Sequence, residues 1–138
     1  MNNPLYLYFE RQGLLFIGSC ALTLLMAIGT LDYNLGPTIS TSLFYIFPVA
    51  LAAWFAGRGP GLSMAVLAAL VWAVTDWGAG MNYDHVLIGV WNSLMRLAIF
   101  ALVAWLVSTL RSALRAVEVA ADTDPLTGLL NRRGVSEA

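Results

Sequence analysis

The sequence predicts an all-α integral membrane protein, a four-helix bundle whose last helix extends into a cytoplasmic coiled coil. Of its 138 residues, 59% are hydrophobic and only 11% are charged, with a mean hydropathy of +0.76. Soluble domains carry about 25% charged residues, so this composition favours a membrane protein. The apolar residues also gather in four windows, each close to the roughly 20 residues that a helix needs to cross a bilayer.

The four windows, taken in order, are residues 13–31, 39–56, 61–77 and 87–110. The first is expected to be retained as a helix, because no Ala-x-Ala cleavage pattern follows it. Pro48 is expected to kink the second helix, since its ring removes one backbone hydrogen bond. The third window is punctuated by small residues, which allow neighbouring backbones to approach closely in lipid.

Charged residues between the windows predict the orientation. With four spans, all the arginines outside the windows fall on one side, namely Arg11, Arg58, Arg111, Arg115, Arg132 and Arg133. The other side carries Asp32, Asp76, Asp84 and His85. The positive-inside rule therefore places both termini in the cytoplasm. The net charge of −1 and the absence of lysine argue against nucleic acid as a partner. Membrane lipids are the partners expected of the apolar windows.

A stripe of apolar residues in the fourth window continues past the end of the apolar run. Its members alternate three and four residues apart, as the seam of a parallel coiled coil requires. They are Phe100, Val103, Val107, Leu110, Leu114 and Val117, with Ala121 next in the series. This spacing favours a homodimer through the last helix, although the inner face of a bundle helix would show the same pattern.

The C-terminal stretch begins with a helix stop, because Pro125 disfavours the helical conformation of Asp124. The ten residues Asp124–Arg133 read Asp-Pro-Leu-Thr-Gly-Leu-Leu-Asn-Arg-Arg. This segment resembles the pattern with which GGDEF-type diguanylate cyclase domains begin. The resemblance implies that Asp124, Asn131, Arg132 and Arg133 form the turn that connects a signalling helix to the cyclase domain.

The resemblance implies that the full-length protein makes cyclic di-GMP from two GTP molecules with Mg²⁺. The catalytic residues of that family would all lie beyond Ala138, so this chain alone is expected to hold no catalytic residue and no cofactor. The domains expected are a transmembrane sensory domain over residues 1–110, a signalling helix over 111–123 and the start of a GGDEF domain over 124–138.

The upstream part looks, more loosely, like the multi-helix sensory regions of bacterial membrane signalling proteins. The residues that carry this likeness are Phe44–Pro48, Trp54–Arg58, and Trp91 and Asn92 with Arg96. It implies a sensor in the bacterial inner membrane and names no ligand.

Arg96 is the most costly residue in the windows, because a charge at the bilayer centre costs about 2.5 kcal/mol or more on insertion scales. Asn92 lies one helical turn away, and Asp76 is the carboxylate best placed to reach Arg96. Trp72 and Trp91 are expected to wall the space between them. One interpretation is a structural ion pair, and the other is a pocket for a small anionic or lipid-like ligand.

His85 and Asp84 form a weak candidate metal site on the outer face, with Asp76 or Asp32 as further ligands. Haem at His85 is a remoter possibility, and the imidazole also suits a pH sensor. A solvated loop explains the same residues without any ligand.

These observations predict the input and dimerisation module of a diguanylate cyclase, acting on its output through the last helix. The alternative is a non-enzymatic membrane anchor, or a small-ligand-binding membrane protein, that has lost its cyclase domain. A small transporter is a third hypothesis, resting only on Arg96 and Asn92.

Overall fold

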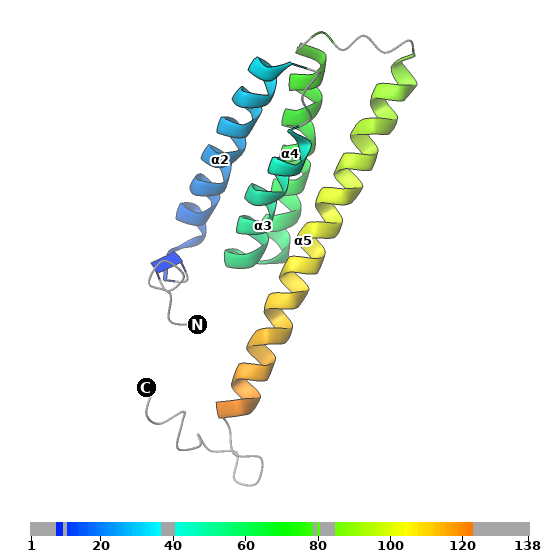
Figure 1. Cartoon of the computed structure of the whole chain (residues 1–138). Coiled ribbons are helices and arrows are strands. Elements are labelled where there is room, and N and C mark those ends of the chain that lie inside the picture. Colours follow the sequence, from blue (N-terminus) through cyan, green and yellow to red (C-terminus); the bar gives the residue numbers. More distant parts are fainter. Residues whose placement is uncertain (1–7, 10, 37–40, 79, 81–84, 123–138) are drawn as a thin grey trace. The chain divides into compact units, whose positions relative to one another are not determined.

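The computed structural model describes residues 8–9, 11–36, 41–78, 80 and 85–122, and within them the regular secondary structure is entirely helical (Figure 1). The elements are α2 (Leu14–Leu35), the 3₁₀ helix η1 (Ser42–Tyr45), α3 (Ile46–Phe55), α4 (Arg58–Gly78) and α5 (Val86–Asp122). The chain divides into two compact units, Met1–Ser108 and Thr109–Ala138, so that α5 begins in the first unit and ends in the second.

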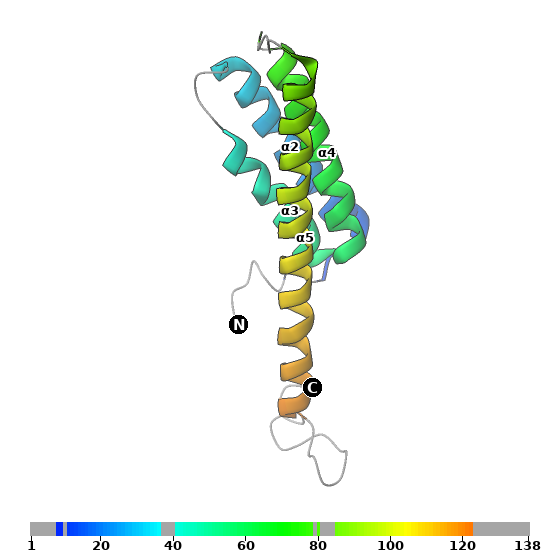
Figure 2. The same ribbon diagram turned by 90° about the vertical axis from the view of Figure 1, so that its right-hand side faces the viewer.

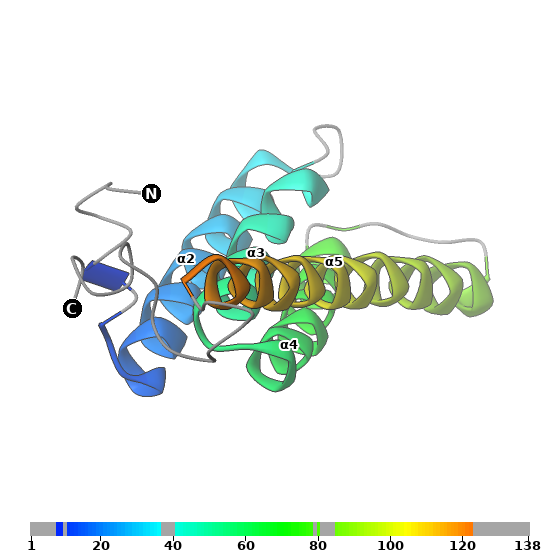
Figure 3. The ribbon, with the colours of Figure 1, turned by 90° about the horizontal axis from the view of Figure 1, so that it is seen from below.

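The first unit is built around α2, α3 and α4, which pack against one another (Figure 2, Figure 3). Small residues let these helices approach closely, as the third window predicted. A Cβ added to Gly61 would lie 2.7 Å from the Cβ of Ala53, and one added to Gly29 would lie 2.7 Å from Cγ1 of Val71. The contacts between α3 and α4 and between α2 and α4 therefore both depend on a glycine.

The second window differs most from expectation. Among its described residues, 41–56, the helical part is the 14 residues Ser42–Phe55, the first four of them as η1. Pro48 lies in the first turn of α3 and does not kink a longer helix. The ring of Pro48 would crowd the carbonyl of Phe44, four residues earlier, which accounts for the 3₁₀ conformation that precedes α3.

Three helices are long and apolar enough to cross a membrane: Leu14–Leu35, Arg58–Gly78 and the Val86–Val117 part of α5. The described residues thus contain four α-helices, of which three are membrane-spanning candidates, where four spans were predicted. The first of these also extends four residues further than its window, because α2 continues to Leu35. Asp32 consequently lies in the last turn of a helix and not in a loop.

Within the first unit, α5 has one face in the core and another outside it. Phe100 and Ala104 are almost completely buried, whereas Leu94, Leu102 and Leu106 are about half exposed. In the second unit the helical residues run on to Asp122. Their pairing in a coiled coil stays a prediction.

Candidate functional site

A single carboxylate, near the C-terminal ends of α2 and α4, joins three elements of the first unit. Asp32 of α2 is half-buried and accepts hydrogen bonds from three hydroxyl groups. Thr41, the residue before η1, donates from Oγ1 to Oδ1 of Asp32. The hydroxyl of Tyr45 lies 2.9 Å from Oδ2, and Oγ1 of Thr75 on α4 lies 3.0 Å from the same oxygen.

The hydroxyl of Thr75 has two acceptors for one proton. Its Oγ1 is 2.8 Å from the backbone carbonyl of Trp72 as well as 3.0 Å from Asp32. Because a threonine hydroxyl donates only one hydrogen, Thr75 shares or alternates its donation between the two. Tyr45 has one acceptor at normal hydrogen-bond distance, so, unlike Thr75, it is committed to Asp32.

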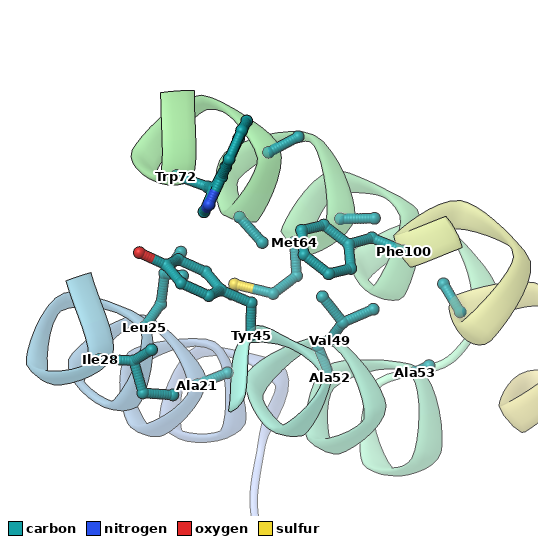
Figure 4. Packing of buried hydrophobic residues seen from close by; sticks show 14 residues of the cluster. Ala21, Leu25, Ile28, Tyr45, Val49, Ala52, Ala53, Met64, Trp72 and Phe100 are labelled. Carbon is teal, nitrogen blue, oxygen red and sulfur yellow. The ribbon is translucent and has the colours of Figure 1, made fainter. Parts of the chain in front are cut away.

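Tyr45 lies at the centre of the hydrophobic core. It is 0% exposed, and its ring stacks on Phe100 of α5 with a centroid distance of 6.2 Å and an interplanar angle of 22°. Figure 4 shows the hydroxyl of Tyr45 directed away from Phe100. One side chain therefore touches the carboxylate of α2 with one end and a core residue of α5 with its face.

Arg96 lies over the indole of Trp72. Its Cζ is 3.6 Å from the ring centroid, within the range of a cation–π interaction. Trp72 is only 6% exposed, so this interaction holds α5 against a buried side chain of α4. Since the carbonyl of Trp72 also accepts the hydroxyl of Thr75, Arg96 joins the polar cluster at its α4 side.

The residues of the predicted ligand site are thus partly brought together. Arg96 and Trp72 are in contact, and Asn92 and Asp76 are half-buried on α5 and α4. Trp91 is 61% exposed, and a side chain so exposed does not wall a space inside the bundle. The geometry adds Asp32, Tyr45 and Thr75, which the sequence reasoning had not placed in the site.

The sequence did carry a signal for two of these residues. On α2 the buried positions Ile17, Ala21, Leu25 and Ile28 are spaced three or four apart, and the next step of that series is Asp32. On α4 the buried series Ala65, Ala68, Trp72 leads likewise to Thr75. Extending each inner face by one turn would have found both polar residues.

Of the two residues of the candidate metal site, only His85 is among the residues that the structure describes. His85 is exposed and Asp84 falls outside that set. Among the residues that the structure describes, no three His, Cys, Asp or Glu side chains lie close enough together to hold a metal ion. The carboxylate of Asp32 is occupied by hydroxyl donors. Asp124, Asn131, Arg132 and Arg133 also fall outside the described set.

The predicted dimer stripe has two different surroundings. Phe100 is 2% exposed inside the chain's own core, and Val103 and Val107 pack against that core. Leu110, Leu114 and Val117, in the second unit, are exposed. Of the stripe residues Phe100 to Val117, only these last three have apolar side chains exposed on the surface and free to contact a second chain.

Two apolar grooves also flank α4. One, between α4 and α5, has a volume of about 280 Å³ and contains a single hydroxyl, that of Ser93, which donates to the carbonyl of Gly89. The other, between α2 and α4, has a volume of about 370 Å³ and reaches Thr75. Neither groove is lined by a charged side chain.

A family model described as a domain of unknown function (DUF4118) matches residues 13–124 of the chain. No curated protein and no solved structure matches the chain. The matched region contains every helix from α2 to α5 and ends where the segment Asp124–Arg133 begins. Because the match spans most of the chain, the protein belongs to the DUF4118 family.

Proposed function

We propose that this chain is the membrane-embedded input and dimerisation module of a signalling protein, whose α5 controls a GGDEF-type cyclase domain that makes cyclic di-GMP from two GTP with Mg²⁺. The observation that carries the proposal is the continuity of α5. This one helix contributes Arg96 and Phe100 to the core and then runs to Asp122, two residues before the segment that resembles the start of a cyclase domain.

A continuous helix suits this role because it resists bending, so a shift at one end is carried to the other. A signal that prefers one arrangement of α5 by a few kcal/mol is enough to change the population of the active state. The cyclase reaction requires two GTP-bearing domains face to face, which a homodimer through the last helix supplies. The natural location is the bacterial inner membrane with both termini in the cytoplasm, in keeping with Arg11 and Arg58 next to the starts of α2 and α4.

For the input site we propose a small anionic or lipid-like ligand near Arg96. The guanidinium lies on the buried ring of Trp72, one helical turn from the half-buried amide of Asn92. A cation and an amide on one face suit an anion. In the competing structural role, Arg96 only holds α5 against α4 through the same contact with Trp72. The two roles differ in the effect expected when the Arg96 side chain is removed.

The first test is catalytic. The protein encoded by the complete reading frame, purified into lipid nanodiscs, is expected to convert GTP into cyclic di-GMP when Mg²⁺ is present and to stop when EDTA removes it. No product under these conditions contradicts the proposed output.

The second test separates the two roles of Arg96. The variant Arg96→Ala is expected to change the rate of cyclic di-GMP formation per folded molecule, and the matched control Trp91→Phe, at an exposed position of the same helix, is expected to leave it unchanged. A variant that lowers only the amount of protein in the membrane, with an unchanged rate per molecule, supports the structural role.

The second candidate function is a non-enzymatic membrane anchor or ligand-binding protein. Its support is the set of three helices long and apolar enough to cross a membrane, which an anchor requires and which needs no catalytic domain. Reading the coding DNA past the codon for Ala138 discriminates the two. A frame that continues into a Gly-Gly-Asp/Glu-Glu-Phe signature supports the cyclase, and a stop codon supports the anchor.

A further inference from the structure

We infer that Tyr45 couples the carboxylate of Asp32 to α5, so that the charge and hydrogen bonding of Asp32 determine the position of α5 relative to α2. For its role in signalling this inference rests on the proposed function, and it names how the input site is regulated. The coupling itself is a property of the Met1–Ser108 unit alone.

The argument starts from the two contacts of Tyr45. Its hydroxyl donates to Oδ2 of Asp32 at 2.9 Å, and its ring stacks on Phe100. Both residues of the stack are at most 2% exposed. In a close-packed core a planar side chain with two rotatable bonds has no free space in which to absorb a displacement. If the hydroxyl follows Asp32, the ring must move as well, and Phe100 meets that ring directly.

Loss of the hydrogen bond from Tyr45 to Asp32 would be costly in free energy, because the Tyr45 side chain is fully buried. A buried phenol without an acceptor has lost its hydration and gained nothing in return. The other oxygen near it is Oγ1 of Thr75, at 3.5 Å, which is a poor substitute for Oδ2 of Asp32. The ring therefore follows the carboxylate when the carboxylate moves or gains another partner.

A second route from Asp32 to α5 exists and supplies the comparison. It passes through Thr75 to the backbone of Trp72 and from the Trp72 ring to Arg96. This route is weaker by construction, because the single proton of Thr75 is divided between Asp32 and Trp72. If it dominated, removal of the Tyr45 hydroxyl would leave the coupling intact.

The experiment measures the distance between α2 and α5 in the purified chain. Spin labels are placed at Leu22→Cys and Leu106→Cys, two partly exposed positions, in a Cys20→Ser background in nanodiscs. Pulsed electron paramagnetic resonance then measures the distance between the two labels in the chain with Asp32 and in the Asp32→Asn variant. This substitution removes the charge and one acceptor oxygen. We expect a change in mean distance of about 1–2 Å, the size of helix shifts in switching proteins.

The decisive comparison repeats Asp32→Asn in a Tyr45→Phe background, which keeps the stack on Phe100 and removes only the hydroxyl. The change in distance is expected to disappear there and to persist in a Tyr33→Phe background, the matched loss of a hydroxyl from an exposed tyrosine next to Asp32. A change that persists with Tyr45→Phe, or an Asp32→Asn variant that changes nothing, overturns the inference.

Two further measurements keep the outcome clear. Phe100→Leu removes the stack by a second means and is expected to abolish the change in distance as Tyr45→Phe does, and helical circular dichroism confirms that each variant is folded. Since the assay contains no cyclase, its failure is separate from a failure to make cyclic di-GMP. A positive distance result with no cyclic di-GMP contradicts the proposed output and leaves the coupling standing.

Discussion

At Gly61 the backbone of α4 lies against that of α3. A Cβ there would sit 2.7 Å from Cβ and 2.8 Å from Cα of Ala53, and a backbone atom does not yield as a flexible side chain does. We expect Gly61→Ala to lower the free energy of unfolding by about 1–3 kcal/mol, the usual cost of overpacking. Unfolding by SDS titration in micelles, followed by circular dichroism, measures it.

The control is Gly18→Ala, where an added Cβ meets nothing within 4 Å. Both glycines lie inside helices, so both variants receive the same gain in helix propensity, and their difference isolates the contact with Ala53. Equal stability of the two variants would show that α3 and α4 do not pack as closely as described.

The contact between Arg96 and Trp72 predicts an interaction energy. A double-mutant cycle with Arg96→Gln and Trp72→Leu is expected to give a coupling of about 0.5–2 kcal/mol, as cation–π pairs do when partly desolvated. The same cycle with Trp91→Leu is expected to be additive within about 0.5 kcal/mol, because the exposed Trp91 ring lies apart from the cluster. Additivity in both cycles would show that Arg96 does not interact with Trp72 and does not belong to the site.

For the helices, the long apolar runs were enough to predict α2, α4 and the first part of α5. The end of α2, and the division of the second window into η1 and α3, were not predictable in this way. An apolar run alone predicted a helix over residues 39–56, but the contacts of Thr41 and Tyr45 with Asp32, together with Pro48, fix where η1 and α3 begin. Such long-range contacts leave no mark in hydropathy.

The candidate site was predictable to a similar extent. Arg96 and Trp72 stood out, because a charge in an apolar window is costly and a neighbouring aromatic ring is a natural partner. Asp32 was assigned to a loop because it follows an apolar run, and Tyr45 resembles an ordinary core aromatic. Their importance arises only when three elements meet, which composition does not reveal.

The two faces of α5 predict different responses to substitution. Phe100→Ala is expected to cost about 3–5 kcal/mol of stability, since it removes a fully buried ring and its stack on Tyr45. Leu102→Ala, at a position 52% exposed on the same helix, is expected to cost less than about 0.5 kcal/mol. The same SDS titration measures both. Similar losses at the two positions would mean that α5 does not pack through the Phe100 face.

At the scale of the whole molecule, the residues available for dimerisation are fewer than the apolar stripe suggests. Phe100 is used within the chain, so a parallel dimer through α5 has the exposed residues Leu110, Leu114 and Val117 as its contact surface. Three such positions make a short seam, which other contacts between the two chains would need to support.

Cysteine cross-linking tests that surface. In a Cys20→Ser background, Leu110→Cys and Leu114→Cys are expected to form disulfide-linked dimers in membranes. A parallel seam places equivalent residues face to face, from where the two Cβ atoms can approach to the roughly 3.5–4.5 Å that a disulfide needs. Ser112→Cys, on the opposite face of the same helical turns, is the matched control and is expected to cross-link far less. Val103→Cys is also expected to stay monomeric, because that side chain packs against its own core. If Ser112→Cys cross-links to the same extent as Leu114→Cys, the cross-links arise from random encounters between chains. The seam is then not the dimer interface.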